Sequence, residues 1–184
     1  MTFGECIVSG GVALFPADTV YGLACDPENA DAVRRLYELK GRPPDKPAAV
    51  MFFDVEQALL PELGPRTRAL MERLLPGAVT LLVPSQRFPL AGGSGTLGLR
   101  VPAIEPLGPG PVLQTSANVA GGPDARRLED VPEAIRLGAD LVLDGGELGG
   151  TPSTVVDLRG YEDRGEWLVV RPGAVPESVV RSLA

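Results

Sequence analysis

Short runs of apolar residues alternate along this chain with polar connections rich in proline and glycine. An apolar run bounded by turn residues indicates a strand, and apolar residues three and four apart indicate a helix. We therefore expect strands in the segments 11–18, 47–53, 78–84, 96–102, 112–117, 139–146, 152–159 and 166–173. Helices are expected after a short leading helical turn, in the segments 30–40, 54–60, 65–75, 128–138 and 176–183.

The helix expected before Gly41 has the clearest boundary signals. Asn29 is a suitable N-cap, and Gly41 followed by Pro43 ends the helical pattern. The residues that share its inner face are Val33, Leu36, Tyr37 and Lys40. An amphipathic helix of this kind packs one face against a sheet.

Strands mixed with helices predict the fold class. The pattern predicts an α/β protein built on one twisted mixed sheet with flanking helices, because some strands follow one another directly and the helices are too few for a doubly wound fold. The length of 184 residues and an apolar fraction of 44% suit a single domain with a real core. We expect residues 1–184 to form one domain, since no repeat or linker interrupts them.

The amino-acid composition argues against several classes of protein. A net charge of −7 argues against a protein whose main role is to coat nucleic acid. Cys6 and Cys25 are the only cysteines and do not form a CxxC pair, so a reducing cytoplasm is expected. No apolar stretch approaches the roughly 20 residues that span a bilayer, and the first residues do not resemble a signal peptide. No membrane association is therefore expected.

The chain contains no histidine. This excludes a Ser-His-Asp triad, a Cys-His pair and histidine-ligated metal sites. Any chemistry must rely on lysine, arginine, carboxylates, hydroxyls, backbone amides or a metal carried by the substrate.

The segment FPADTVYGL, residues 15–23, places polar side chains where a buried strand ends. Asp18, Thr19 and Tyr21 lie there together, and the chain is expected to turn on Gly22. Loops at strand ends often carry function. Asp18 and Tyr21 are expected to fix the turn and the wall of a pocket.

Positive charge is concentrated after the helix that ends at Gly41. Lys40, Arg42 and Lys46 fall within seven residues, and three cations so placed could bind a polyphosphate. The alternative is a solvated helix C-terminus, where the helix dipole favours cations.

Other strand ends carry hydroxyl and guanidinium groups. Arg100 and Gly98 share one face of the expected strand at 96–102, and this position alone favours a sheet edge in water over a cleft. The remaining polar groups at strand ends are Thr115, Ser116, Asn118, Ser153, Thr154 and Arg171. Together they suit the binding of phosphate and carboxylate in one site.

Standard nucleotide signatures do not account for such a site. The chain has no GxxxxGK[ST] motif. A formal GxGxxG occurs at residues 93–98, but a strand and not a helix follows it. A dinucleotide fingerprint is therefore rejected. These glycines are expected to form a flexible loop, and the alternative is that they let the backbone approach a ligand closely.

Seven motifs occur in one order over nearly the whole chain: PADTVYGL, KGRPPDKP, PGAVTLLVP, TLGLRVP, TSANVAGG, PSTVVD and RPG. In this combination the chain resembles the YrdC/TsaC family, the threonylcarbamoyl-adenylate synthases. The resemblance is to the single-domain form. It implies a sheet that lines a concave, positively charged cavity.

The resemblance also implies an activity. L-threonine, bicarbonate and ATP with Mg²⁺ would give threonylcarbamoyl-AMP and pyrophosphate, with no tightly bound cofactor and no side-chain nucleophile. The product would pass to a separate tRNA threonylcarbamoyl transferase machinery. The threonine contacts it implies are Thr19, Arg100, Thr115 and Ser153, with Arg100 on the carboxylate. The ATP contacts it implies are Lys40, Arg42, Lys46, Thr96, Ser116, Asn118 and Arg171.

The chain departs from the family pattern at Ala17, where threonine is common, and at Met51, where many relatives have histidine. The segment 103–112 is also too short and too rich in proline and glycine to form the helix that members of the family usually have there. Two alternatives stay open. One is a module that binds double-stranded RNA or assists ribosome assembly, with weak RNA binding. The other is a diverged paralogue that binds nucleotide without threonine chemistry.

Overall fold

The computed structural model describes residues 1–92, 95–108 and 110–184. Its strands form one sheet of nine strands in the order β7-β1-β2-β6-β3-β5-β4-β8-β9. The pairs β1–β7, β3–β5 and β4–β8 are parallel and the others antiparallel, which confirms a mixed sheet. The strands are β1 Ala13–Pro16, β2 Tyr21–Cys25, β3 Ala49–Met51, β4 Val79–Pro84, β5 Thr96–Arg100, β6 Val112–Ser116, β7 Leu141–Val142, β8 Thr154–Gly160 and β9 Glu166–Arg171.

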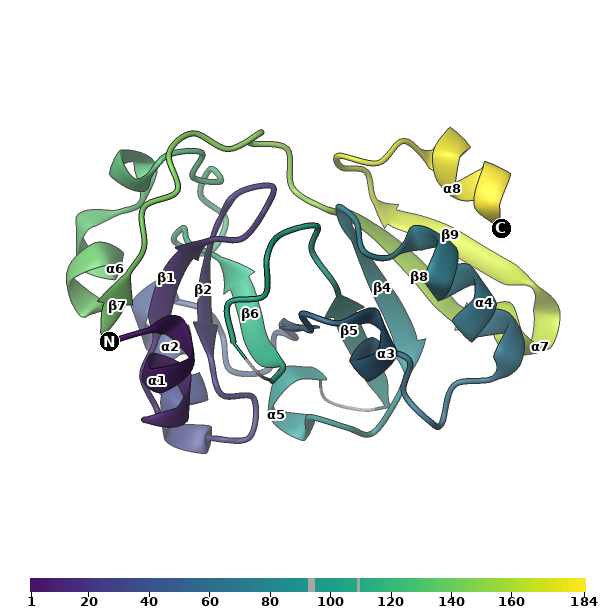
Figure 1. Cartoon of the computed structure of the whole chain (residues 1–184), viewed down its shortest axis with the longest axis horizontal. Helices are drawn as coiled ribbons and strands as arrows, with labels where there is room; N and C mark the ends of the chain where they lie inside the picture. The colour runs from purple at the N-terminus through teal and green to yellow at the C-terminus, as the bar shows by residue number, and fades with distance from the viewer. Residues whose placement is uncertain (93–94, 109) are drawn as a thin grey trace.

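The helices flank this sheet (Figure 1). They are α1 Phe3–Val8, α2 Ala30–Lys40, α3 Val55–Ala58, α4 Pro65–Leu74, α5 Pro89–Gly92, α6 Glu133–Gly138, α7 Tyr161–Arg164 and α8 Glu177–Leu183, with a 3-10 turn η1 at Leu128–Asp130. Among the described residues, no helix is long and apolar enough to cross a membrane.

Helix α2 forms as its sequence predicts. The Asn29 side chain accepts hydrogen bonds from the backbone amides of Asp31 and Ala32, and Gly41 ends the helix in the left-handed conformation at φ 59°. The inner face that ends at Lys40 is buried. The amphipathic pattern therefore sets both the bounds and the orientation of α2.

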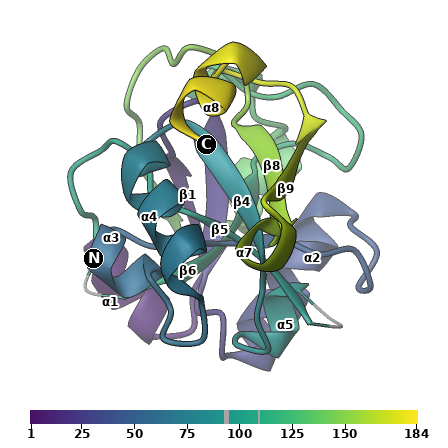
Figure 2. The same cartoon turned by 90° about the vertical axis from the view of Figure 1, so that its right-hand side faces the viewer.

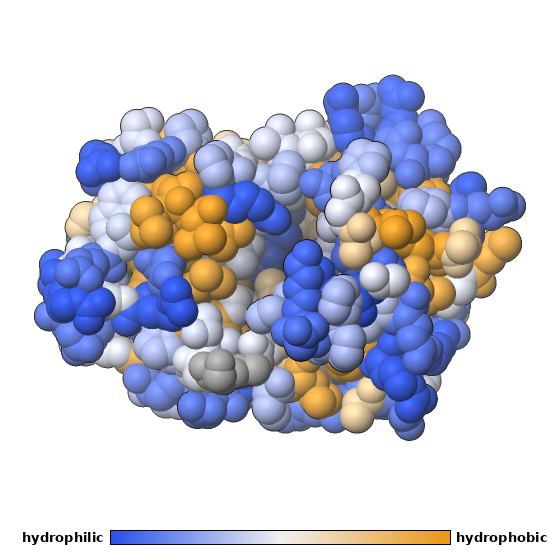
Figure 3. Space-filling model, turned by 180° about the vertical axis from the view of Figure 1, so that it is seen from behind, coloured by the Kyte–Doolittle hydropathy of each residue, from blue (hydrophilic) through white to orange (hydrophobic). Residues whose placement is uncertain are grey.

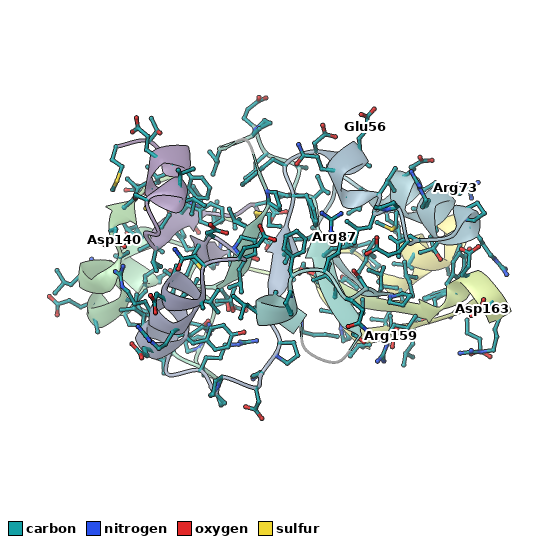
Figure 4. The ribbon with its side chains drawn as sticks, turned by 90° about the horizontal axis from the view of Figure 1, so that it is seen from below. Glu56, Arg73, Arg87, Asp140, Arg159 and Asp163 are labelled. Carbon is teal, nitrogen blue, oxygen red and sulfur yellow. The ribbon has the colours of Figure 1, made fainter. Side chains whose placement is uncertain are left out.

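Helices cover the two halves of the sheet differently. Helices α1 and α2 lie on opposite sides of β1 and β2, whereas α4 covers one side of β4 and β8 (Figures 1 and 2). Two buried clusters follow from this, a large one around Leu36 and Leu81 and a smaller one around Phe3 and Phe15. In β8 the residues alternate between buried and partly exposed, so one face of this half is open. Asp140, beside β7, and Asp163, in α7, mark the two ends of the molecule (Figure 4).

The segment 15–23 differs from its expectation. Strand β1 ends at Pro16, and a hairpin connection of residues 17–20 leads into β2, which the sequence did not indicate. Gly22 does not turn the chain but pairs with Ser116 inside the sheet. A side chain there would place its Cβ 2.6 Å from Nε2 of Gln114 and 3.3 Å from Cβ of Ala17, so the glycine allows close packing within the sheet.

Two other expectations were wrong in detail. The strand expected at 139–146 is reduced to Leu141–Val142, and the short helices α5 and α7 were not anticipated. The described part of the segment 103–112 contains no helix, as its composition predicts. Of the GxGxxG match, residues 93–94 lie outside the described residues, and Thr96 already belongs to β5.

Candidate active site

A cavity of about 540 Å³ opens on the uncovered face of the sheet. Seen from behind, the molecule is hollowed at its centre (Figure 3). Its floor includes Ala49, Leu82 and Gly98, from β3, β4 and β5. Small residues at two of these positions leave room for a ligand to lie on the sheet.

The cavity brings together every residue that the resemblance implied as a threonine or ATP contact, whereas Thr154 and the two residues expected at a pocket wall, Asp18 and Tyr21, do not line it. The lining includes Thr19, Lys40, Arg42, Lys46, Thr96, Arg100, Thr115, Ser116, Asn118, Ser153 and Arg171. They come from three strands, from the end of α2 and from four connections that are far apart in sequence. The ligand that each residue contacts stays a prediction.

Arg100 does not lie at a sheet edge, because β5 pairs with β3 and β4. Its side chain is buried and its Nη2 lies 2.5 Å from Oδ1 of Asp18. The arginine therefore points into the cavity from the middle of the sheet. An alternating strand pattern cannot show this, since it does not reveal which strands are central.

Lys40, the last residue of α2, is fully buried at the cavity wall. Its Nζ donates to the backbone oxygens of Ser116 and Asn118 at 2.5 and 2.8 Å, and to Oδ1 of Asn118 at 2.6 Å. Burial, with a smaller effect of nearby Arg42 and Lys46, lowers the pKa of Lys40 from 10.5 to about 8, although Asp124 acts in the opposite direction. Lys40 thus fixes the loop after β6, and its charge adds to the field of the cavity.

Arg42 shapes the connection between α2 and β3. Its guanidinium donates to the backbone oxygens of Lys46 and Pro47 and lies over the ring of Tyr37. The hydroxyl of Tyr37 donates to the same oxygen of Lys46, at 2.9 Å. These contacts hold the two ends of the connection together beside the cavity. The side chains of Arg42 and Lys46 both line the cavity.

Arg171 approaches from the opposite side. Its Nη2 donates to the backbone oxygen of Ser153 at 2.7 Å, and Oγ of Ser153 lies 2.8 Å from Oγ1 of Thr80. Burial lowers the pKa of Arg171, while the carboxylate of Asp124 raises it and the charge of Arg100 lowers it. Arg171, Arg100 and Asp124 all line the cavity, so their charges act on one another within it.

The sequence reasoning missed three polar residues that line the cavity: Thr80, Gln114 and Asp124. Thr80 and Gln114 are polar residues inside otherwise apolar strands, and this pattern could have indicated that they line a site. Asp124 lies in the loop after Gly122, and nothing in the sequence distinguishes it from a solvated turn residue. Among the described residues it is the one carboxylate of a lining that also holds five cationic side chains.

Two polar atoms at the cavity have no hydrogen-bond partner in the described protein. They are Oγ1 of Thr19 and Nε of Arg100, and both are fully buried. Buried polar atoms are nearly always paired in folded proteins, so each exception requires an explanation. Both residues line the cavity, so the two unpaired atoms belong to side chains that border it.

The structure is that of an α/β protein with a mixed sheet and a concave cavity lined by cationic and hydroxyl side chains. The family model described as "Telomere recombination", that of Sua5, YciO and YrdC, matches residues 5–173. The chain therefore belongs to the Sua5/YciO/YrdC family.

Individual relatives agree with this assignment. The chain is 35% identical to a protein of Pyrococcus abyssi named threonylcarbamoyl-AMP synthase, over 92% of this chain and 52% of that protein. It is 39% identical to the Thiobacillus denitrificans protein of the same name, over 81% of this chain and 85% of that protein. Its fold matches Sua5 of P. abyssi, crystallised with L-threonine, at a TM-score of 0.87 and 31% identity, over 97% of this chain and 55% of that one. The chain thus spans about half the length of the first of these relatives.

Proposed function

We propose that this chain is an L-threonylcarbamoyladenylate synthase, which forms threonylcarbamoyl-AMP and pyrophosphate from L-threonine, bicarbonate and ATP. The observation that carries the proposal is the convergence of hydroxyl and guanidinium groups from distant segments in one cavity. The names of the relatives and the threonine complex of P. abyssi Sua5 support it.

The lining residues offer two sets of groups, one that we propose for the phosphates and one for the amino acid. Arg42, Lys46 and Arg171 offer positive charge for a triphosphate, with Ser116 and Asn118 held in place by Lys40. Arg100 and Thr19 offer a guanidinium and a hydroxyl with unpaired atoms for the amino acid. A set of groups for phosphates together with a set for a carboxylate is what a reaction between ATP and an amino acid requires.

The chemistry needs no side-chain nucleophile. The threonine amine and bicarbonate form a carbamate with loss of water, and a carbamate oxygen then attacks the α-phosphorus of ATP and expels pyrophosphate. Binding the reactants side by side supplies proximity, for which effective molarities correspond to as much as roughly 7–11 kcal/mol. Arginine and lysine charges stabilise the phosphates as the bond to pyrophosphate breaks.

Mg²⁺ is expected to arrive with ATP. Within the part of the chain that the structure describes, no group of three or more histidine, cysteine or acidic residues could hold a metal ion. Mg²⁺ is often bound by one carboxylate together with substrate phosphates, and Asp124 fits this role. The metal would neutralise phosphate charge, and Asp124 would supply a carboxylate oxygen to hold it.

Pyrophosphate release tests the proposal directly. Purified protein with ATP, Mg²⁺ and bicarbonate should release pyrophosphate only when L-threonine is added, and mass spectrometry should detect threonylcarbamoyl-AMP. Release that does not depend on threonine would reject the synthase. ATP binding without any threonine-dependent product would instead indicate the diverged paralogue. The product would serve a separate transferase that modifies tRNA.

A further inference from the structure

Asp18 has an unusual backbone in the connection between β1 and β2. Its φ is 123°, in a region that residues with a side chain rarely adopt. Its carboxylate oxygen Oδ1 accepts from the backbone amide of Thr19 at 2.6 Å and from Nη2 of Arg100 at 2.5 Å. A strained residue persists only where its surroundings hold it, and these contacts do so.

The ion pair is enclosed within the protein. The side chains of Arg100 and Asp18 are 5% and 11% exposed. Arg100 lines the cavity and Asp18 does not, so the carboxylate lies behind the guanidinium as seen by a ligand. Nη1 of Arg100 lies 3.5 Å from Oε1 of Gln114, which leaves Nε as the buried donor without a partner.

The charge of this pair affects whether a phosphate group or a carboxylate group binds at Arg100. Arg100 is close enough to Arg171 for its charge to lower the pKa of that residue. A triphosphate drawn to Arg171 would therefore also be drawn to an unpaired Arg100, since a guanidinium binds phosphate and carboxylate equally well in geometry. Asp18 cancels the net charge of Arg100 but leaves donors on its cavity side.

We propose that Asp18 is a positioning and specificity-determining residue, which fixes Arg100 and neutralises its charge so that this end of the cavity accepts one carboxylate and not a phosphate chain. The inference rests on the proposed function and deepens it. A single carboxylate forms short hydrogen bonds with the remaining donors, whereas a polyphosphate needs net positive charge. The amino acid and ATP are thereby kept at separate ends.

The test uses Asp18→Asn, which keeps the size of the side chain and an acceptor for Arg100 but removes the charge. Inorganic tripolyphosphate is titrated by calorimetry and as an inhibitor against L-threonine. The affinity for tripolyphosphate should rise about tenfold, and inhibition should become competitive with threonine. Asp31→Asn, an exposed position on α2 that pairs only with Arg34, removes the same charge and should have neither effect.

A second variant keeps the inference testable if Asp18→Asn fails to fold. Asp18→Gly suits the positive φ and removes the contact with Arg100, so threonine affinity should fall about tenfold because the guanidinium is no longer held. The double variant Asp18→Asn, Arg100→Gln should lose the gain in tripolyphosphate affinity, which a purely structural role of Asp18 would not produce.

The outcomes are distinguishable. Unchanged tripolyphosphate affinity in Asp18→Asn, or a gain that survives the double variant, would overturn the inference. Unchanged threonine affinity in Asp18→Gly would overturn it as well. A wild-type chain that binds no L-threonine would overturn the proposed function, and the calorimetric titrations with tripolyphosphate would still decide whether Asp18 excludes phosphate.

Discussion

The ammonium of Lys40 lies 2.6 Å from the side-chain oxygen of Asn118, across 78 positions of sequence. The same side-chain oxygen accepts from the hydroxyl of Ser116 at 2.6 Å, and Nδ2 of Asn118 donates to the backbone oxygen of Gly122. The end of α2 is thereby joined to the loop after β6. This loop carries Asn118 and Asp124, both of which line the cavity, so the contact positions part of the cavity wall.

Asn118→Ala should weaken ATP binding about tenfold and lower the free energy of unfolding by about 1–3 kcal/mol, because it leaves the buried ammonium of Lys40 short of an acceptor. Calorimetry with ATP and chemical denaturation measure the two effects. Asn29→Ala is the matched control, since it removes only the cap of α2 and should cost about 1 kcal/mol of stability without changing ATP affinity. Equal losses of ATP affinity in both variants would contradict the role of Asn118.

The lowered pKa of Lys40 predicts a pH dependence of nucleotide binding. ATP favours the charged form, so affinity should be greatest below pH 8 and fall as the pH rises through about 8. The free energy of unfolding should change with pH in the opposite direction. Between about 8 and 10.5 the unfolded chain holds a proton that the folded chain has lost, so this group makes the free energy of unfolding rise with pH. ATP titrations from pH 6.5 to about 9.5 check the first trend, and a flat profile would contradict it.

Arg100→Ala should weaken threonine binding about tenfold or more and leave ATP binding nearly unchanged, because a charge-assisted hydrogen bond to the carboxylate is lost. Titration of the purified variant with each ligand separately measures both constants. Arg35→Ala removes an exposed arginine that pairs with Asp140 outside the cavity and serves as the control. Equal losses for both ligands would show that Arg100 has a structural role.

Asp124→Asn should raise the Mg²⁺ concentration needed for half-maximal ATP binding several-fold, because one oxygen ligand of the metal loses its charge. Metal-free ATP should bind slightly more tightly to this variant, since a carboxylate near Lys40 and Arg171 no longer repels the phosphates. ATP titrations with Mg²⁺ and with EDTA separate the two effects. A loss that is the same under both conditions would exclude a metal role.

Tyr21→Phe should lower the free energy of unfolding by about 1 kcal/mol and loosen the segment 143–153. The Tyr21 hydroxyl accepts from the amide of Gly145 at 2.9 Å and lies 2.9 Å from oxygens of Asp144 and Gly146. Hydrogen exchange should therefore become faster at Gly145 and its neighbours. Unchanged protection there would show that other contacts, such as the bond from Gly150 to Thr19, hold this segment alone.

The local features of this protein follow from its sequence. Helix α2 begins after Asn29 and ends at Gly41 as capping preferences predict, and its buried face includes Lys40. The strands β3, β4, β5, β6 and β9 lie within segments whose apolar runs predict them, and β8 extends one residue beyond its predicted segment. The absence of histidine removed whole classes of mechanism. Each of these inferences depends on neighbouring residues and general rules of conformation, which a single sequence contains.

The sequence also indicated which kinds of functional group the site contains. Hydroxyls and guanidiniums at strand ends indicated phosphate and carboxylate binding, and all of those chosen for the site line the cavity. The sequence could not say how they meet, because strand order does not follow from the strands themselves. Placing β5 between β3 and β4 turned Arg100 from an edge residue into a central one.

Tertiary structure alone decided the features that depend on contacts between distant segments. Gly22 was expected to bend the chain but lies within β2, where it packs closely against the side chain of Gln114. Asp18 takes a rare backbone conformation beside an arginine 82 positions away. Asp124 faces five cations that no local pattern associates with it. Sequence patterns report local preference and burial, whereas partners and charges are set only when the sheet brings distant strands together.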